Sequence, residues 1–317
     1  MYLIDNGSHI DKALTNMAIK GFSGREGFIA DALFPTVPVG KQSDRYYVID
    51  PDTYLRVPLT IRAPGAPAKL IEFKLTSESY FADNYALGTQ TPLETLANAD
   101  LGGAMIRQNN NNLILDGLAR DREIRVAALV TSISNVGSGV ALTGANKWSD
   151  YVGSNPIGDI NSGHAFIRNK TGLIANTMAI DYDTLIALQH HPLIRDYVKY
   201  TQSGPVPLTE IMALYRVKQV LVASGIYNSA KEGATAVMTN IWGNFISLLH
   251  VQPAVTMETA TFGLAFQWRP EEFPAPMVVE RYPHHNKSRK LEIQEAQYFQ
   301  DEKVVARDLA YTITGTL

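Results

Sequence analysis

Cysteine is absent from this 317-residue chain. Without thiols the protein has no disulfide framework, no thiolate metal site and no cysteine nucleophile. Long apolar runs are missing too: no segment approaches the roughly 20 residues that cross a bilayer. Residues 1–11 have neither the basic region nor the apolar region of a secretory signal. We therefore expect a soluble protein that is made in a reducing cytosol, is not exported and has no membrane partner.

An excess of positive charge is also lacking, because 28 Lys and Arg residues face 31 Asp and Glu residues, for a formal net charge of −3. A general nucleic-acid binder takes its affinity from a concentrated basic surface. The composition excludes that class and leaves only local basic patches open. With 45% hydrophobic and 19% charged residues, the chain is typical of a globular protein with one large domain or two ordinary ones.

The motifs of common enzyme sites are missing as well. No Gly-x-Ser-x-Gly elbow holds a serine nucleophile. Residues 137–139 (GSG) lack the rest of a dinucleotide or phosphate loop, so we interpret them as a flexible turn. The pairs His190-His191 and His284-His285 are adjacent residues, whose side chains point in different directions, and Glu271-Glu272 are neighbours on an expected loop. We predict no catalytic, cofactor-binding or metal-binding residues and no cofactor.

The strongest positive signal is one long helix, expected at about 92–130. Thr91 is suited to cap its first turn, Pro92 to occupy the first helical position, and Glu94 to complete a capping box. Apolar residues recur at spacings of three and four, and a helix of this length spans about 50 Å. We expect it to lie along something extended. Weak helix formers interrupt the stripe: Gly102, Gly103, Asn109 to Asn112, and Gly117.

The N-terminal third reads as extended and punctuated by proline. After helical segments at 11–19 and 22–34, residues 34–39 (FPTVPV) are expected to be extended. Strand patterns at 45–49 and 70–85 flank a proline-rich stretch, which predicts a long two-stranded excursion with an irregular tip. Such a ribbon is marginal by itself in water, so it should lie on a neighbour.

Beyond the long helix we expect a loop passage at 135–163, anchored by Trp148 and Tyr151, with a turn at Asn155-Pro156. Two amphipathic helices follow, at 181–200 with Asp181 as cap, and at 208–223, closed by Gly225. The basic run at 287–290 (KSRK) suits a hairpin turn or an ion pair between subunits. No internal repeat is visible, which argues against solenoids and propellers. Strands are expected at 241–251, 262–269, 276–282, 290–294 and 310–314.

This order of parts resembles the major capsid proteins of tailed bacteriophages with the HK97-type fold. The resemblance rests on the FPTVPV run leading to the Tyr46-Tyr47 strand, and on Pro92-Leu93 opening the helix. It implies an α+β fold with an N-terminal arm, an extended E-loop, a long spine helix in a P-domain, and a mixed α/β A-domain. The implied domains are 1–40 for the N-arm, 41–87 for the E-loop, 88–175 with 275–317 for the P-domain, and 176–274 for the A-domain.

The resemblance also implies a structural function rather than an enzymatic one. Copies of the chain would assemble as hexamers and pentamers into an icosahedral shell around double-stranded DNA, in the host cytoplasm, and remain in the virion. Because the chain starts almost at its arm, we expect a separate scaffolding protein or trimming. A portal is a further expected partner, contact with packaged DNA would be non-specific, and a decoration protein is left open.

Two alternatives remain at this point. An encapsulin-like compartment would have the same fold and enclose an enzyme instead of a genome. A soluble hydrolase with an α/β core would bury the long helix and use His190 and His191 in catalysis. Lys69 and Lys74 lie in the expected E-loop, but no matched partners can be assigned, so we predict clamping between subunits without a covalent cross-link.

Overall fold

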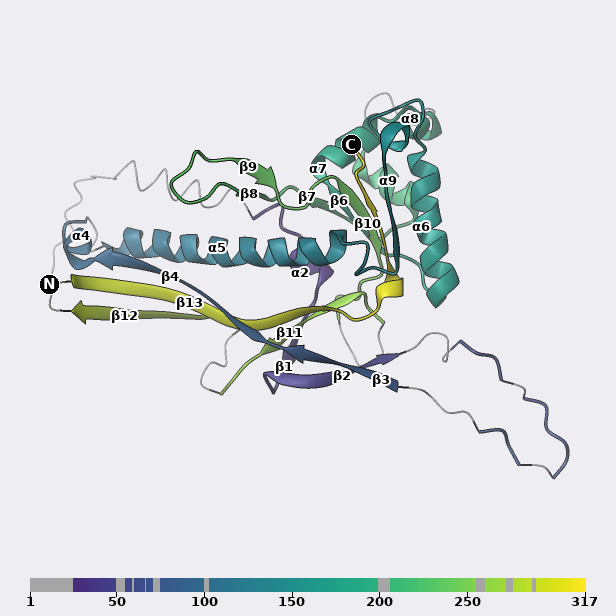
Figure 1. The fold of residues 1–317 in the computed structure, drawn as a ribbon, viewed down its shortest axis with the longest axis horizontal. Coiled ribbons are helices and arrows are strands. Elements are labelled where there is room, and N and C mark those ends of the chain that lie inside the picture. The colour runs from purple at the N-terminus through teal and green to yellow at the C-terminus, as the bar shows by residue number, and fades with distance from the viewer. Residues whose placement is uncertain are drawn as a thin grey trace.

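The protein is elongated, with a long helix lying along one sheet, a second sheet with several helices at one end, and a ribbon that reaches outward (Figure 1). A computed structural model describes residues 25–49, 55–58, 60–65, 67–70, 75–99, 103–198, 206–254, 260–271, 276–286 and 289–317. The helix expected at 11–19 lies outside these residues. Of the helix expected at 22–34, the described part contains only α2 (Ala30–Leu33).

One five-stranded sheet, the long sheet, is built around β13. This strand has 16 residues, enough for β12 to pair with its first half and β11 with its second half along one edge, while β4 pairs along the other edge. The short β1 adds to β11 in parallel and confirms the extended FPTVPV segment. The strands are β1 (Thr36–Val39), β4 (Asp83–Pro92), β11 (Gly263–Trp268), β12 (Val278–Asn286) and β13 (Arg289–Val304).

The predicted single helix at 92–130 is wrong in one respect: it is two helices. α4 (Leu93–Ala97) ends before a break, and α5 (Ala104–Thr131) begins after Gly103, whose φ is +73°. An added Cβ at Gly103 would lie 2.8 Å from Leu96 Cδ2, so this left-handed position requires glycine. The predicted capping box is also wrong. Thr91 belongs to β4 and pairs with Glu292 of β13, and Pro92 is the N-cap, with no side-chain hydrogen bond.

The long helix α5 has 28 residues, or about 42 Å, and lies on one face of the long sheet. Ile114 and Leu118 of α5 pack with Ala296 and Tyr298 of β13. Gly117 lets the two layers approach, because a Cβ there would lie 2.6 Å from Leu87 Cδ2 of β4. The prediction that the helix lies along something extended is confirmed.

The second sheet, the compact sheet, has the order β5-β14-β10-β6-β7 and carries the main core. Every residue of β6 and β10 is buried, as expected for strands covered on both faces. The helices α6, α7, α8 and α9 gather around this sheet (Figure 1). The strands are β5 (Ser138–Ala141), β6 (Thr177–Asp181), β7 (Gln219–Ala223), β10 (Phe245–Leu249) and β14 (Ala310–Thr314).

The predicted loop at 135–163 is wrong, because it contains β5, a 3₁₀ turn at Gly144–Asn146 and the first half of α6 (Pro156–Thr171). Asn155 and Pro156 start this helix instead of forming a turn: the Asn155 side chain accepts from the Gly158 N–H at 3.0 Å. An Asn-Pro pair suits the start of a helix as well as a turn, because asparagine is a good N-cap and proline suits the first helical position. Trp148 is fully buried, so its predicted role as an anchor is confirmed.

The helix predicted at 181–200 is divided. Asp181 caps α7 (Tyr182–His190) as predicted, accepting from the Asp183 and Thr184 N–H groups. The chain then turns at His191, before Pro192 opens α8 (Pro192–Val198), because a residue preceding proline avoids helical backbone.

The helix predicted at 208–223 is right only for its first half. α9 (Leu208–Tyr215) ends at Arg216, whose φ is 55°, and Gln219–Ala223 is strand β7, parallel to β6. Gly225 therefore follows a strand and closes no helix. A short apolar run such as residues 220–222 fits a helix or a buried strand equally well by periodicity, and the open edge of β6 decided between them.

The predicted two-stranded excursion is confirmed: β2 (Ser43–Ile49) pairs antiparallel with β3 (Leu75–Phe81). We call β2, β3 and the described residues between them the ribbon. It extends away from the body in Figure 1. The second strand was predicted too long, at 70–85, because β3 ends at Phe81 and Asp83 already begins β4. A smaller hairpin, β8 (Ile226–Asn228) with β9 (Met238–Asn240), follows β7 and precedes β10 in the chain.

Two strands of the C-terminal half pair in a different sheet from the one that the expected domain bounds suggest. The tail strand at 310–314 was expected to complete the sheet of the P-domain, but β14 pairs with β10 and β5 in the compact sheet. Conversely, the strand at 262–269, assigned to the A-domain, is β11 of the long sheet. The 3₁₀ turn Arg307–Leu309 redirects the chain between the sheets. Alternation of polar and apolar residues predicts a strand but not the sheet that it joins.

Candidate assembly site

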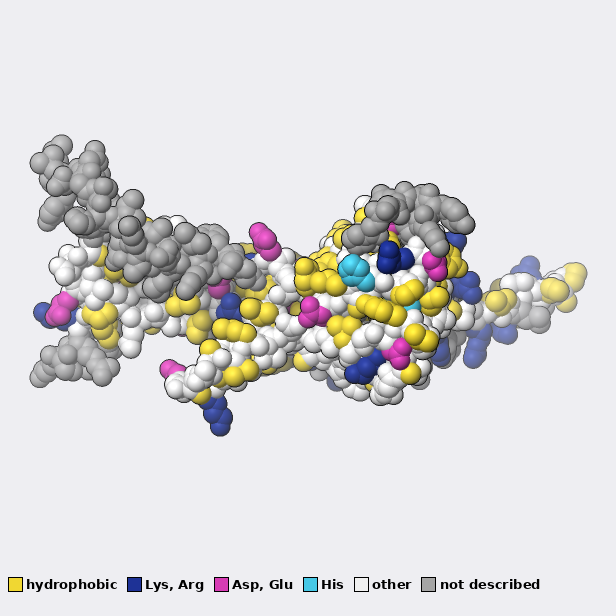
Figure 2. All heavy atoms as spheres, turned by 90° about the horizontal axis from the view of Figure 1, so that it is seen from above, with side chains coloured by type: hydrophobic (Ala, Val, Ile, Leu, Met, Phe, Trp, Pro, Cys, Tyr) yellow, Lys and Arg dark blue, Asp and Glu magenta, His cyan; other side chains and the backbone are white. Residues whose placement is uncertain are grey.

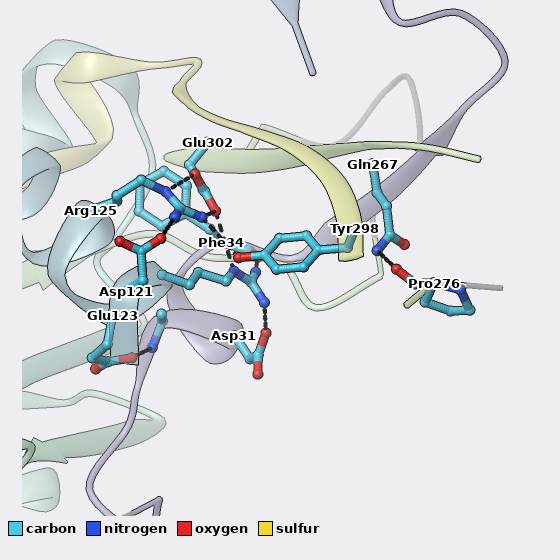
Figure 3. A network of polar contacts seen from close by, with 11 residues as sticks. Asp31, Phe34, Asp121, Glu123, Arg125, Gln267, Pro276, Tyr298 and Glu302 are labelled. Atoms are coloured by element: carbon cyan, nitrogen blue, oxygen red, sulfur yellow. Dashed lines mark hydrogen bonds and ion pairs between the residues drawn. The ribbon is translucent and has the colours of Figure 1, made fainter. Parts of the chain in front are cut away.

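The root of the N-terminal arm is fastened to the long helix by a buried carboxylate. Glu123 of α5 is 1% exposed and accepts hydrogen bonds from the backbone N–H of Ile29 at 2.8 Å and of Ala30 at 3.0 Å. The indole Nε1 of Trp242 donates to it at 2.7 Å. Burial raises the pKa of Glu123 against the opposing effect of these donors. One side chain thus joins the arm, the long helix and the loop before β10. Figure 3 shows Glu123 on α5 with its hydrogen bond to the backbone.

Two residues further along α5, Arg125 connects the helix to the long sheet. Its Nε and Nη2 donate to the two carboxylate oxygens of Glu302 at 3.2 and 3.1 Å, and Nη2 also donates to the Tyr298 hydroxyl at 3.1 Å. The guanidinium lies 3.6 Å from the ring centroid of Tyr85 in β4. Burial acts to lower the pKa of Arg125, but Glu302 outweighs it and the pKa is raised. Arginine is suited to this site because its planar guanidinium can bind a carboxylate through two nitrogens and stack on an aromatic ring.

Arg122 adds a second link to the arm. It forms an ion pair with Asp31 of α2 and lies 3.4 Å from Glu302. Nearer the N-terminus, Arg25 forms an ion pair with Asp116 of α5. The arm root is therefore bound to the long helix at two places about two turns apart, at Asp116 and at Arg122 with Glu123.

The far end of α5 is attached in the same way. Arg107 forms a bidentate ion pair with Glu292 of β13: Nε donates to Oε1 at 2.7 Å and Nη2 to Oε2 at 2.9 Å. The hydrogen bond from Arg107 holds the pKa of Glu292 below its usual value. A bidentate pair of this kind fixes orientation as well as distance, so the helix is clamped to the sheet at both ends.

The root of the ribbon packs on the face of the long sheet that is turned away from α5. The ring of Phe266 lies 4.6 Å from Tyr80 in a stacked arrangement and 5.1 Å from Tyr46. Asp301 of β13 accepts the backbone N–H of Phe81 at 2.9 Å. These contacts fix the direction in which the ribbon leaves the body.

The outer part of the ribbon has almost no cover from its own chain. Val57 is 91% exposed, Ile61 88% and Leu70 89%. Arg56, Arg62 and Lys69 are also exposed. Figure 2 shows these apolar and basic side chains at one end of the molecule. Lys74 lies outside the described residues.

The first histidine pair is divided between the surface and the core. His191 is fully buried, its Nδ1 accepts from the Leu193 N–H at 3.3 Å, and its Nε2 lies 3.0 Å from Ser154 Oγ. Ser154 donates to the Asp150 carbonyl at 2.6 Å, so it accepts from His191, the opposite of the direction that activates a serine nucleophile. Burial lowers the pKa of His191 and keeps it neutral. His190 is exposed, and His284 and His285 are adjacent residues of β12.

The remaining candidate segments lie in strands or at the surface where the structure describes them. The predicted flexible turn at 137–139 is wrong: β5 begins at Ser138, and a Cβ on Gly139 would lie 2.5 Å from the Thr312 carbonyl oxygen. Asn286 pairs with Arg289, which confirms the predicted hairpin around 287–288, residues that are not described. Glu271 is exposed, and Glu272 lies outside the described part. Within the described residues no three His, Asp or Glu side chains gather as metal ligands.

Sequence reasoning missed the network around Glu123, Arg125 and Glu302. Its contacts join residues 94, 119 and 177 positions apart. The sequence does contain a signal: five of the six residues at 120–125 are charged, although this segment lies in the helix that was expected to bury one of its faces. Charges on a buried stripe need partners.

No protein-family model matches the chain. The chain is 29% identical over 270 residues to the major capsid protein of Pseudomonas phage JBD67, covering 82% of this chain and 83% of that protein. It is 27% identical over 245 residues to the major capsid protein of Burkholderia phage BcepMu, covering 76% of each. No helix in the described part of the chain has the length and apolar character needed to cross a bilayer.

Two solved structures resemble the whole fold. A phage-related protein from Bordetella bronchiseptica RB50 superposes with a TM-score of 0.72 at 22% identity, over 96% of this chain and 97% of that chain. The mature capsid of bacteriophage PhiM1 superposes with a TM-score of 0.56 at 11% identity, over 90% and 86%.

A long helix on a long sheet, an α/β body at one end and an outward ribbon define the α+β HK97-type fold of phage capsid subunits. With its two sequence relatives, the chain is recognised as a phage major capsid protein. Its role is structural: it is a virion component that joins other capsid subunits in a shell.

Proposed function

We propose that copies of this chain form hexamers and pentamers that close into an icosahedral shell around double-stranded DNA, and that they do so in the cytoplasm of the host. The observation that carries the proposal is the ribbon. Its outer side chains are almost fully exposed, although three of them are large and apolar. A two-stranded ribbon without a covering layer is marginal in water, so its stable state requires another copy. Obligate interfaces of this kind bury about 2,000 to 5,000 Å².

The domain division belongs to this proposal. Residues 1–40 act as the N-arm, 41–87 as the E-loop, 88–175 with 275–317 as the P-domain, and 176–274 as the A-domain. Within this proposal we count β11 with the P-domain, because it pairs in the long sheet, and β5 and β14 with the A-domain, because they pair in the compact sheet.

Several partners follow from a shell of this type. A separate scaffolding protein guides assembly, and a portal occupies one vertex. Packaged DNA contacts the inner wall without sequence preference, and the net charge of −3 keeps that contact weak enough for release. Whether a decoration protein binds the outside depends on the exterior of the closed shell.

The test is electron microscopy of the purified protein, alone and co-expressed with its gene neighbours, with light scattering for mass. Uniform megadalton shells support the proposal, and monomers or small oligomers in both preparations contradict it. Nuclease-protected DNA in the shells distinguishes a genome container from a compartment loaded with protein.

A deletion tests the ribbon directly. Removing 45–85 would cut into β4 and the stacking of Tyr85 on Tyr298, so the informative deletion is 50–74 with a short turn in its place. This variant should keep the circular-dichroism spectrum of the parent and form no shells. Shell formation by the deletion variant would refute the role of the ribbon.

A further inference from the structure

A cavity of about 440 Å³ lies between the arm root, the long helix and the long sheet. The arm root contributes Phe28 to its wall, α5 contributes Leu115 and Leu118, and the segment before β12 contributes Met277. Cavities that bind small molecules commonly measure about 300–1,000 Å³ and combine mostly apolar walls with a few polar groups. This cavity therefore has the size and the apolar walls of a small-molecule site.

One wall of the cavity carries a buried amide that lacks a partner. Gln300 of β13 is 2% exposed, and its Nε2 has no hydrogen-bond partner in the described part of the chain. Gln300 comes two residues after Tyr298, which packs on α5, so both side chains lie on the face of the strand that borders the cavity. A buried donor without an acceptor destabilises the folded chain. An acceptor atom inside the cavity would satisfy it.

A cation beside this amide has no carboxylate partner. Nε and Nη2 of Arg269 donate to Gln267 Oε1 at 3.1 and 2.8 Å, and no described acidic residue forms an ion pair with Arg269. Gln267 is held in turn by its donation to the Pro276 carbonyl at 2.8 Å, which Figure 3 shows. Gln267 is directly opposite Gln300 in the ladder of β11 and β13. The guanidinium is thus oriented by a neutral amide next to Gln300, and its charge is uncompensated.

The other charged groups of the wall already have partners. Arg25 and Arg122 form ion pairs with carboxylates of α5 and α2, and Glu123 accepts three hydrogen bonds. Among the described residues that line the cavity, Arg269 is the cation that remains for a ligand. A single positive charge matches a singly charged anion better than a phosphate dianion.

We propose that this cavity binds an organic monocarboxylate with an apolar body. The carboxylate pairs with Arg269 and accepts a hydrogen bond from Gln300 Nε2, while the apolar body packs on Phe28, Leu115 and Met277. Such a ligand contacts the arm root, the long helix and the long sheet together, so it stabilises their association. Both a free organic acid and the C-terminus of a peptide present this chemistry. The inference is independent of the proposed shell function.

The test is isothermal titration calorimetry of the purified full-length protein with 4-phenylbutyrate. The matched probes are its neutral amide, 4-phenylbutanamide, and inorganic phosphate. The acid is expected to bind at least about tenfold more tightly than either probe, because the charged hydrogen bonds and the apolar contacts are both needed. The dipeptide N-acetyl-Ala-Phe, with a free or an amidated C-terminus, distinguishes the two sources. Tighter binding of the free-terminus peptide than of 4-phenylbutyrate assigns the site to a peptide, and weaker binding assigns it to a free acid.

Two variants separate the site from an effect on folding. Arg269→Gln removes the charge, Gln300→Leu removes the amide, and each is expected to weaken the binding of 4-phenylbutyrate at least about tenfold. Without ligand, Gln300→Leu should melt at a higher temperature than the parent, because it removes a buried polar group that has no partner. Weaker binding by a more stable protein excludes misfolding as the cause. The matched control, Lys231→Gln at an exposed position, should bind like the parent.

Three results would each overturn the proposal. They are equal binding of the two acids and their amides, binding of phosphate as tight as that of 4-phenylbutyrate, and binding by Arg269→Gln that equals the parent. Calorimetry measures binding whether or not the protein forms shells, so this outcome is separate from that of the proposed function.

Discussion

Glu123→Ala tests the idea that a single buried carboxylate fastens the arm to the body. The change leaves three buried donors without an acceptor: the Ile29 and Ala30 N–H groups and the Trp242 indole. An unsatisfied buried donor costs about 1–3 kcal/mol, so even the lower end gives about 3 kcal/mol of lost unfolding free energy. With an unfolding entropy of about 2.1 cal/mol/K per residue, this corresponds to a melting temperature roughly 5 °C lower.

The assay is thermal unfolding of the unassembled subunit, followed by tryptophan fluorescence and circular dichroism. Trp242 reports on the site itself, so its emission should change in the folded variant as well. Glu232→Ala, at an exposed position, is the matched control and should melt within about 1 °C of the parent. Equal melting temperatures for the Glu123 and Glu232 variants would refute the reasoning.

Three further outcomes are expected. Burial raises the pKa of Asp181 to about 6, so the folded state binds the extra proton: stability rises as pH falls from above 6 towards 4 and is lost as pH rises. Asp181→Asn should flatten that dependence in melting curves between pH 4 and 7, and an unchanged slope would assign the dependence to other groups. Gly139→Ala forces a Cβ to 2.5 Å from the Thr312 oxygen and should cost about 1–3 kcal/mol in urea unfolding; an unchanged midpoint would show that β5 is free to shift. Arg125→Lys gives up the bidentate contact with Glu302 and should cost about 2 kcal/mol in the same assay, whereas a loss below about 0.5 kcal/mol would mean that the pair adds nothing.

Prediction succeeded where the signal lies within a few neighbouring residues. Asp181 caps α7 because its side chain meets N–H groups two and three residues ahead, an interaction that is complete within one turn. The prolines at 35 and 38 exclude helix locally, and β1 is extended as expected. The two strands of the ribbon were visible from their composition alone.

Prediction failed where a distant part of the chain chooses between two local solutions. Residues 219–223 suit a helix or a strand by their apolar run, and the free edge of β6 selected the strand. The pair Asn155-Pro156 suits a turn or a helix start, and the body around the compact sheet favoured α6. The break at Gly103 follows from the close approach of Leu96, which no local pattern records.

By itself, the sequence determined a cysteine-free, nearly neutral chain with an extended N-terminal third, a ribbon, a long helical segment and a strand-rich end, an order of parts that resembles a capsid subunit. Only the tertiary structure decided which sheet each strand joins and how the buried charges of α5 are paired. The physical reason is that the signals readable in the sequence, helix capping and side-chain periodicity, act over only a few neighbouring residues. The Glu123, Arg125 and Glu302 contacts form only after chain segments 94 to 177 residues apart have been brought together.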